Sequence, residues 1–169
     1  WPPTSTQPGA LLPEILSLLG ARTGRRGGAL TVTGKRRIAG VDLDLSAASE
    51  LSPTLFSLAA FADAPTTLHG IGHIRGHETN RIDALIGNLR ALGGEAEELP
   101  DGIRITPRPL HGGLWRAHHD HRIATAGANR AFVMNAPGST GGVRDAIAAV
   151  GPLLAHIVDQ LEDGDQPGE

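Results

Sequence analysis

The stretch Arg75-Gly76-His77-Glu78-Thr79-Asn80-Arg81 decides the fold of the chain around it. A short apolar run typical of a strand precedes it at residues 66–72. After it, apolar residues recur with the spacing of one helix face; they are Ile82, Leu85, Ile86, Leu89 and Leu92. Gly93-Gly94 is typical of a helix end. The sequence therefore predicts a strand and then a helix, with His77, Glu78 and Arg81 in or just before the first helical turn.

This strand-to-helix corner has the composition of an anion-binding site. The backbone N–H groups at a helix start and the positive end of the helix dipole favour a bound anion. Glu78 and Arg81 are three residues apart, so we expect them on one helix face. A carboxylate beside a guanidinium can act as a proton donor next to an anion clamp. An ordinary helix start with one local ion pair has the same pattern, so both interpretations stay open.

Composition limits the classes of protein. The 169 residues are 40% hydrophobic, which is enough for one domain with a core, or for a domain with tails. The net charge of −3 disfavours a general nucleic-acid or membrane-surface binder. Without cysteine there is no disulfide framework. The sequence has neither an apolar run of membrane-spanning length nor a secretory leader, so we expect a cytoplasmic protein. Because the first residue is Trp1, we expect part of a longer or processed chain.

The rest of the chain alternates between helical and strand patterns. We expect helices at residues 10–19, 49–62, 120–133 and 143–161, and strands at residues 29–33, 40–45, 95–99, 102–106 and 114–117. We expect a loop at residues 135–142 and a disordered acidic tail at residues 162–169. This order predicts an α/β (α+β) fold with helices buried against sheets.

Three further groups of residues could carry chemistry. Glu50 and Arg122 each lie at the start of an expected helix, where an acid is favourable and an arginine can clamp an anion. The run His118-His119-Asp120-His121 looks like a metal cluster. Its three histidines cannot all face one way on a helix, and no further ligand set has the spacing of a metal site. Neither a phosphate loop nor a dinucleotide fingerprint is present, so we expect no metal and no cofactor.

Two motifs resemble those of the 5-enolpyruvylshikimate-3-phosphate synthase family. Residues 76–81 are similar to the family's Lys/His-Glu-Thr-Asp-Arg motif, and residues 120–124 are similar to its Asp-His-Arg-Met-Ala motif. The segments at residues 98–107 and 109–117 and the distance between the motifs also fit. The resemblance runs from about Trp1 to Val133 and is closest to actinobacterial members.

The resemblance implies a fold and a reaction. The family's enzymes have two domains, each made of three strand-helix-strand-helix-strand-strand units, with helix N-termini directed at the cleft between them. By this resemblance, residues 1–161 would be an incomplete C-terminal domain. The family transfers the enolpyruvyl group of phosphoenolpyruvate to the 5-hydroxyl of shikimate 3-phosphate and releases phosphate, in the shikimate pathway to chorismate and the aromatic amino acids. It needs no metal or cofactor.

The matched positions also imply roles. Glu50 corresponds to the base on the sugar-ring hydroxyl, and Glu78 to the acid that handles the proton of the enolpyruvyl methylene. His77 corresponds to a contact with shikimate 3-phosphate, and Arg81 and Arg122 to the arginines that hold phosphoenolpyruvate.

The sequence departs from the family at three points. Asn80 replaces the motif's Asp, and residues 143–152 contain no lysine where the family has one, with Arg144 as the available cation. The chain is under half the family's length, so a separate N-terminal half is a possible partner. A catalytically inactive remnant or binding module of the family is an alternative. A UDP-N-acetylglucosamine enolpyruvyl transferase is a weaker alternative, because the two motifs disfavour it.

Overall fold

A computed structural model describes residues 6–126, 128–129 and 131–132. The expected loop at residues 135–142, the expected helix at residues 143–161, Arg144 and the acidic tail lie outside the described residues. Among the described residues, no helix is both long and apolar enough to cross a membrane.

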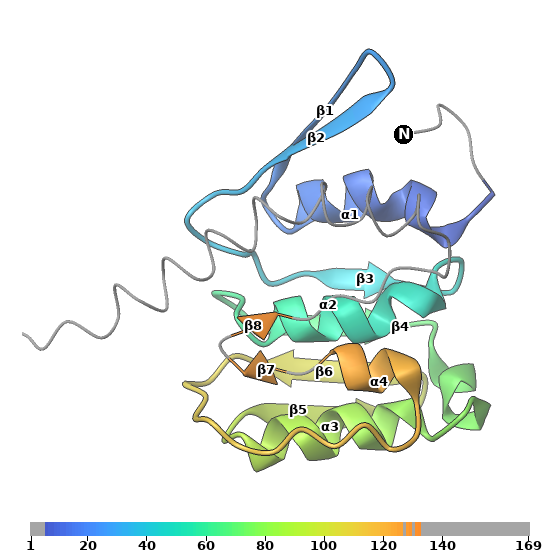
Figure 1. Ribbon diagram of the computed structural model, residues 1–169, viewed down its shortest axis with the longest axis vertical. Helices are drawn as coiled ribbons and strands as arrows, with labels where there is room; N and C mark the ends of the chain where they lie inside the picture. Colours follow the sequence, from blue (N-terminus) through green and yellow to red (C-terminus); the bar gives the residue numbers. More distant parts are fainter. Residues whose placement is uncertain (1–5, 127, 130, 133–169) are drawn as a thin grey trace, which may run out of the picture.

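The centre of the fold is a four-stranded sheet with the order β3-β4-β6-β5 (Figure 1). Its strands are β3 (Asp42–Asp44), β4 (Thr66–His69), β5 (Glu95–Leu99) and β6 (Gly102–Thr106). The helices between them are η2 (Ser49–Leu51), α2 (Ser52–Ala59), η3 (Gly72–Gly76) and α3 (Arg81–Ala91). β3 pairs with β4 in parallel, so a crossover through α2 must join them, and the other pairs are antiparallel. This is one complete strand-helix-strand-helix-strand-strand unit.

Alternation along the strands sends one face of the sheet into the core. Leu68, Ile103 and Ile105 are fully buried under α2 and α3, whereas Arg104 on the other face is exposed. The hairpin β5–β6 pairs Leu99 with Gly102 across a tight turn, as the sequence predicted. The backbone of Leu68 lies so close to Gly102 that a side chain there would collide with it. The expected mixed α/β fold, with helices buried against a sheet, is confirmed.

Helix α3 agrees with its predicted pattern. Asn80 is its N-cap, with Oδ1 accepting a hydrogen bond from the backbone N–H of Asp83 at 3.3 Å. The apolar face predicted from the sequence is buried, and the helix ends before Gly93, whose φ of +87° suits glycine.

A second part of the fold precedes this unit. It contains η1 (Pro8–Leu11), α1 (Leu12–Leu18) and the antiparallel pair β1 (Arg22–Arg26) and β2 (Ala29–Thr33). In Figure 1 this hairpin lies beyond α1, away from the four-stranded sheet. β2 was predicted, but β1 was missed because its strand is polar and almost wholly exposed.

Three predicted elements need correction. The strand predicted at residues 114–117 is irregular, because the side chain of Asn88, and not a neighbouring strand, binds both backbone groups of Arg116. The helix predicted at residues 120–133 is wrong beyond its first turns. α4 (His121–Thr125) is short, and β7 (Ala128–Asn129) and β8 (Ala131–Phe132) follow it.

The third correction concerns the strand-to-helix corner. The strand β4 ends at His69, and η3 separates it from α3. His77 and Glu78 therefore lie in the loop before the N-cap Asn80, and only Arg81 is in the first helical turn.

Candidate active site

The two arginines of the sequence motifs converge on one carboxylate. Glu50 lies in the short helix η2, and its Oε2 is 2.6 Å from Nη2 of Arg122 and 3.8 Å from Nη1 of Arg81. Arg122 also donates from Nη1 to the backbone carbonyl of Glu50, at 3.4 Å. Three segments distant in the sequence thus meet at this point.

Arg81 is held from two sides. As the first residue of α3 it is only 3% exposed, and its Nε donates to Oδ2 of Asp120 at 2.7 Å. Its Nη1 is 2.8 Å from Nδ1 of His77. A guanidinium only donates hydrogen bonds, so Nδ1 of His77 accepts and the proton of a neutral ring sits on Nε2. The guanidinium therefore has a fixed orientation.

Asp120 connects the two motifs. It is the N-cap of α4, where Oδ1 accepts from the backbone N–H groups of Arg122 at 2.8 Å and Ile123 at 3.2 Å. Burial alone raises the pKa of this carboxyl group. The hydrogen bond from Arg81 and the two backbone N–H groups outweigh burial, so the pKa of Asp120 is lower than usual. Asp120 is therefore a buried carboxylate that remains ionised.

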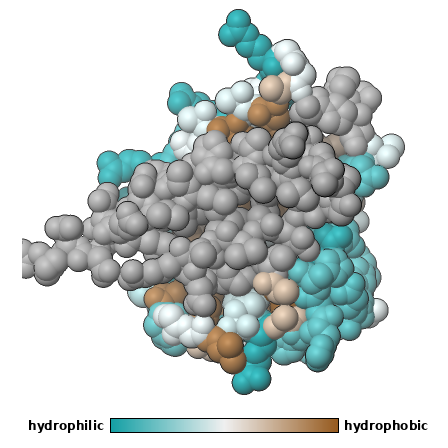
Figure 2. All heavy atoms as spheres, viewed as in Figure 1, coloured by the Kyte–Doolittle hydropathy of each residue, from teal (hydrophilic) through white to brown (hydrophobic). Residues whose placement is uncertain are grey.

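Glu78 does not share a helix face with Arg81, contrary to the sequence expectation. Because Glu78 precedes the N-cap, the spacing rule for one helix face does not apply to it. Its Oε2 is instead 2.9 Å from Nδ1 of His121, and both side chains are largely exposed. Figure 2 shows hydrophilic residues gathered on the side where η3 and the start of α3 lie.

His73 extends this polar cluster. Its Nε2 is 3.0 Å from the hydroxyl of Ser49, the neighbour of Glu50. Its ring also packs edge-on against His77, with ring centroids 5.9 Å apart. The sequence analysis missed His73, although its four-residue spacing from His77 was an available signal. These contacts join the loop that carries His77 to the turn that carries Glu50.

The structure thus brings together Glu50, His77, Arg81 and Arg122, four of the five site residues predicted from the sequence. The fifth, Glu78, borders this cluster through its contact with His121. Sequence reasoning did not identify Asp120 as the residue that connects them, since its oxygens act only through the folded arrangement.

The segment at residues 107–119 is tied to α3 and α4. The amide of Asn88, which is buried, donates to the carbonyl of Arg116 at 2.9 Å and accepts from its N–H at 2.8 Å. Trp115 donates from Nε1 to the carbonyl of Ile123 at 2.7 Å. These bonds hold the chain that leads into Asp120.

One group in the described part of the chain combines residue types that can bind a metal ion. Potential ligand atoms of Glu78, Asp120 and His121 all lie within 4.8 Å of one another. Both oxygens of Asp120 are already engaged, one by the guanidinium of Arg81 and one by backbone N–H groups. A cation would have to displace that guanidinium, so the group does not fit a metal site.

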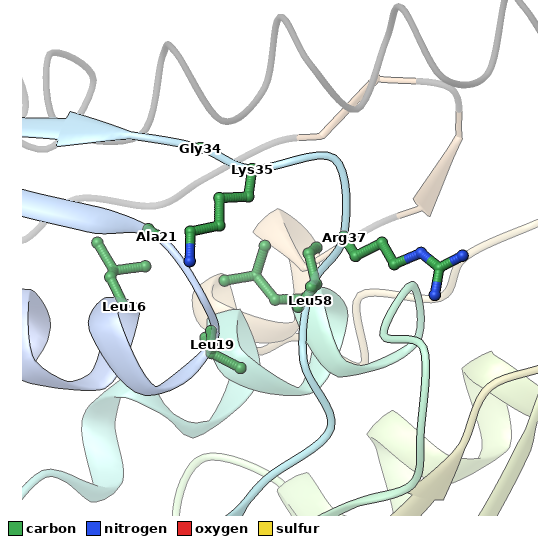
Figure 3. Close-up of a pocket in the computed structure, with 8 residues that line it drawn as sticks. Leu16, Leu19, Ala21, Gly34, Lys35, Arg37 and Leu58 are labelled. Atoms are coloured by element: carbon green, nitrogen blue, oxygen red, sulfur yellow. The ribbon is translucent and has the colours of Figure 1, made fainter.

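A separate small pocket lies between α1, α2 and the chain after β2 (Figure 3). Figure 3 shows Lys35 directed toward Leu16, whereas Arg37 points away from the pocket. The residues that line this pocket are mostly aliphatic, and none of them is a site residue.

Known proteins similar to this chain carry one family name. The family description EPSP synthase (3-phosphoshikimate 1-carboxyvinyltransferase) matches residues 1–148. The chain is 51% identical over 128 residues to the 3-phosphoshikimate 1-carboxyvinyltransferase of Kocuria rhizophila, covering 76% of this chain and 29% of that protein. It is 48% identical over 136 residues to the enzyme of the same name from Bifidobacterium longum, covering 76% and 31%.

A solved structure is also similar. The EPSP synthase of Acinetobacter baumannii superposes with a TM-score of 0.59 at 30% identity, covering 72% of this chain and 32% of that one. The chain thus spans less than a third of the length of each relative. With the family match over most of its length, the chain belongs to the EPSP synthase (3-phosphoshikimate 1-carboxyvinyltransferase) family.

Proposed function

We propose that this chain forms one wall of a site that transfers the enolpyruvyl group from phosphoenolpyruvate to the 5-hydroxyl of shikimate 3-phosphate. The observation that carries the proposal is the convergence of Arg81 and Arg122 on a single carboxylate oxygen of Glu50. Two guanidinium groups in this arrangement suit an anion with a carboxylate and a phosphate.

Each site residue has a role in this proposal. Arg81 and Arg122 hold phosphoenolpyruvate, and His77 contacts shikimate 3-phosphate. Glu50 takes the proton of the 5-hydroxyl while that oxygen attacks C2 of phosphoenolpyruvate, and Glu78 gives a proton to C3. In the second step Glu78 takes a proton back from C3 of the tetrahedral intermediate, and the bond from C2 to the phosphate oxygen breaks. Phosphate leaves with the electron pair of that bond and the proton held by Glu50. The proposed reaction uses no metal or cofactor.

Turnover by this proposal needs a second wall. General acid–base chemistry and group transfer depend on both substrates being held in a fixed geometry. Because the chain matches less than a third of each relative, we propose that residues 1–161 act as part of a C-terminal domain. A polypeptide equivalent to the N-terminal part of the relatives would complete the cleft, and the assembly would work in the cytoplasm.

The motif substitution Asn80 bears on the alternative of an inactive binding module. The side chain of Asn80 contacts Asp83 and caps α3, whereas Arg81 is held by Asp120 and His77, and Arg122 by Glu50. The substitution therefore leaves the contacts that fix the arginines in place, which supports the catalytic proposal over the inactive one.

Phosphate release tests the proposal. The purified chain would be assayed with phosphoenolpyruvate and shikimate 3-phosphate, alone and mixed with a separately expressed N-terminal part of the Kocuria rhizophila relative. We expect turnover only in the mixture, and none when the chain carries Arg122→Ala. UDP-N-acetylglucosamine in place of shikimate 3-phosphate tests the other acceptor. Absence of phosphate release in every arm, with the chain folded by circular dichroism, would leave the inactive binding module as the function.

A further inference from the structure

Asp120 binds both arginines of the candidate site, Arg81 through its side chain and Arg122 through its backbone. Its carboxylate is completely buried and reaches Arg81 with one oxygen and the backbone of Arg122 with the other. We propose that Asp120 is a positioning residue that sets the orientation of both arginines toward the bound anion. The inference rests on the proposed function for the identity of that anion, phosphoenolpyruvate.

The contact with Arg81 fixes the plane of its guanidinium. Asp120 Oδ2 binds the Nε of Arg81 at 2.7 Å, which leaves Nη1 directed toward His77 and Glu50. A guanidinium is planar, so one strong bond at Nε together with burial determines where its other N–H groups point. The side chains of Arg81 and Asp120 are 4% and 0% exposed, so water competes little for this bond.

The contact of Asp120 with the backbone fixes the position of the main chain from which the Arg122 side chain extends. Oδ1 of Asp120 accepts from the N–H of Arg122 itself and from that of Ile123. This cap sets the first turn of α4, from which Arg122 extends to Glu50 at 2.6 Å. One carboxylate thereby holds the side chain of one arginine and the main chain of the other.

No other small polar side chain can do both. An asparagine at position 120 would have one acceptor oxygen for three N–H donors. A serine would retain the helix cap, because Ser is a favoured N-cap residue, but it would lose the contact with Arg81. Asp120→Ser therefore separates the contribution of the cap from the contribution of the ion pair.

A double-mutant cycle tests the inference. We would measure the Kd of phosphoenolpyruvate by calorimetry for the wild type, Asp120→Ser, Arg81→Lys and the double variant, with Asp83→Asn as an exposed-carboxylate control. A hydrogen bond to a charged group changes an equilibrium constant by about 10- to 100-fold, so we expect Asp120→Ser to weaken binding by up to that factor. In the Arg81→Lys background the same change should have little further effect, because the partner is already lost.

Kinetics in the mixture with the N-terminal part of the relative add a second readout. Asp120→Ser should raise the KM for phosphoenolpyruvate and leave the KM for shikimate 3-phosphate near its wild-type value. Three results would each overturn the inference, because a residue with a merely structural role would give them. They are an equal rise in KM for both substrates, full additivity of Asp120→Ser with Arg81→Lys, and the same loss of phosphoenolpyruvate binding in Asp83→Asn.

A measurement on the wild-type chain needs no variant and no substrate. Nitrogen-15 NMR of the arginine Nε–H groups should show a signal for Arg81 with slow solvent exchange, because this group is buried against Asp120. Fast exchange at Arg81, like that of exposed arginines, would overturn the inference even if Asp120→Ser did not fold. A protected signal in a chain that does not bind phosphoenolpyruvate would instead contradict the proposed function and leave the support by Asp120 standing.

Discussion

Glu50 and Arg122 form an ion pair of 2.6 Å, and the same oxygen of Glu50 lies 3.8 Å from Arg81. A carboxylate of the protein thus occupies the position between the guanidinium groups that we assign to phosphoenolpyruvate. Glu50 has to leave this position, or share it, when the substrate binds. Its proposed role as base on the acceptor hydroxyl requires the same movement.

Replacement of this carboxylate should have opposite effects on binding and on turnover. Glu50→Gln keeps the size of the side chain and removes the charge that competes for the arginines, so we expect tighter binding of phosphoenolpyruvate by calorimetry. Loss of a general base costs about 10²- to 10⁴-fold in rate, so phosphate release in the mixture should fall by that factor. Glu95→Gln, which breaks an exposed ion pair with Arg108, is the matched control. Weaker binding in Glu50→Gln would mean that Glu50 orients the arginines instead of competing with the substrate.

Glu78 should matter for the reaction and not for the fold. Its contact with His121 is exposed on both sides, and such pairs contribute at most about 1 kcal/mol. Glu78→Gln should therefore leave the free energy of unfolding within about 1 kcal/mol of the wild type, while phosphate release falls by about 10²- to 10⁴-fold. Chemical denaturation and the phosphate assay measure the two effects. Glu98→Gln, which loses an ion pair with Arg75, should retain turnover; wild-type turnover in Glu78→Gln would remove Glu78 from the mechanism.

Protonation of Asp120 should lower the free energy of unfolding at acid pH. Its folded pKa is below the usual aspartate value of 3.8, so the ionised carboxylate contributes stability in full above the unfolded pKa. This contribution is lost as the pH falls from near 3.8 through the folded pKa. The free energy of unfolding, measured by urea titration at pH values from about 6 to 2, should drop over this interval in the wild type.

The variant Asp120→Asn isolates this contribution. It removes one partner of a buried ion pair, which typically costs about 3–5 kcal/mol at neutral pH. Its stability should change less with pH between 4 and about 2 than that of the wild type. Asp44→Asn is the control, because hydrogen bonds from Ser46 also lower the pKa of Asp44, whose side chain is exposed at the end of β3. An equally steep acid loss in Asp120→Asn would assign the pH dependence to other carboxylates.

Helices and strands whose pattern is complete within a short stretch of sequence were predicted correctly. The apolar spacing of α3 and the turn of the hairpin β5–β6 are complete within short windows, and both elements formed with bounds close to those expected. β1 gave no such signal, because a strand of exposed polar residues has the composition of a loop. α4 ended early although the run contains several alanines, since Gly127 and Asn129 have little intrinsic preference for a helix.

The site was predictable as a set of residues but not as a set of contacts. Arg81 and Arg122 were identified by their positions in the two motifs, and Glu50 by its place at an expected helix start and by the family resemblance. The three residues do meet. Their meeting depends on how η2, α3 and α4 pack, which no local pattern contains. The pairing of Glu78 with His121 shows the same limit, because the helix spacing rule assumed a helix that begins only after Glu78.

Asn80 should be replaceable by the aspartate of the family motif at some cost in stability. Its Nδ2 donates to Oδ2 of Asp83 at 2.6 Å, and an aspartate there would place two carboxylates together. The helix cap would survive, but one hydrogen bond would be lost, at about 0.5–1.5 kcal/mol. Asn80→Asp should therefore unfold at lower denaturant at pH 7, and Asp83→Asn should compensate. Binding of phosphoenolpyruvate should be unchanged, and markedly tighter binding would show that the motif's aspartate acts on the arginines.

Asn88 should control the segment that leads into Asp120. Its buried amide satisfies both backbone groups of Arg116, and Asn88→Ala would leave them without these partners. An unsatisfied buried polar group costs about 1–3 kcal/mol, so the variant should be less stable by at least that amount. Asn88→Asp keeps the acceptor for the N–H of Arg116 and loses the donor, so it should have an intermediate stability.

The substitution Asn88→Ala should also alter the surroundings of Trp115. The segment that Asn88 holds also carries the bond from Trp115 to the carbonyl of Ile123 in α4. In a Trp1→Phe background, where Trp115 is the remaining tryptophan, Asn88→Ala should shift its fluorescence to longer wavelength because the ring becomes more exposed to water. We also expect weaker phosphoenolpyruvate binding, since Asp120 follows this segment directly. Unchanged fluorescence together with a loss of stability would confine the role of Asn88 to α3 and separate it from the site.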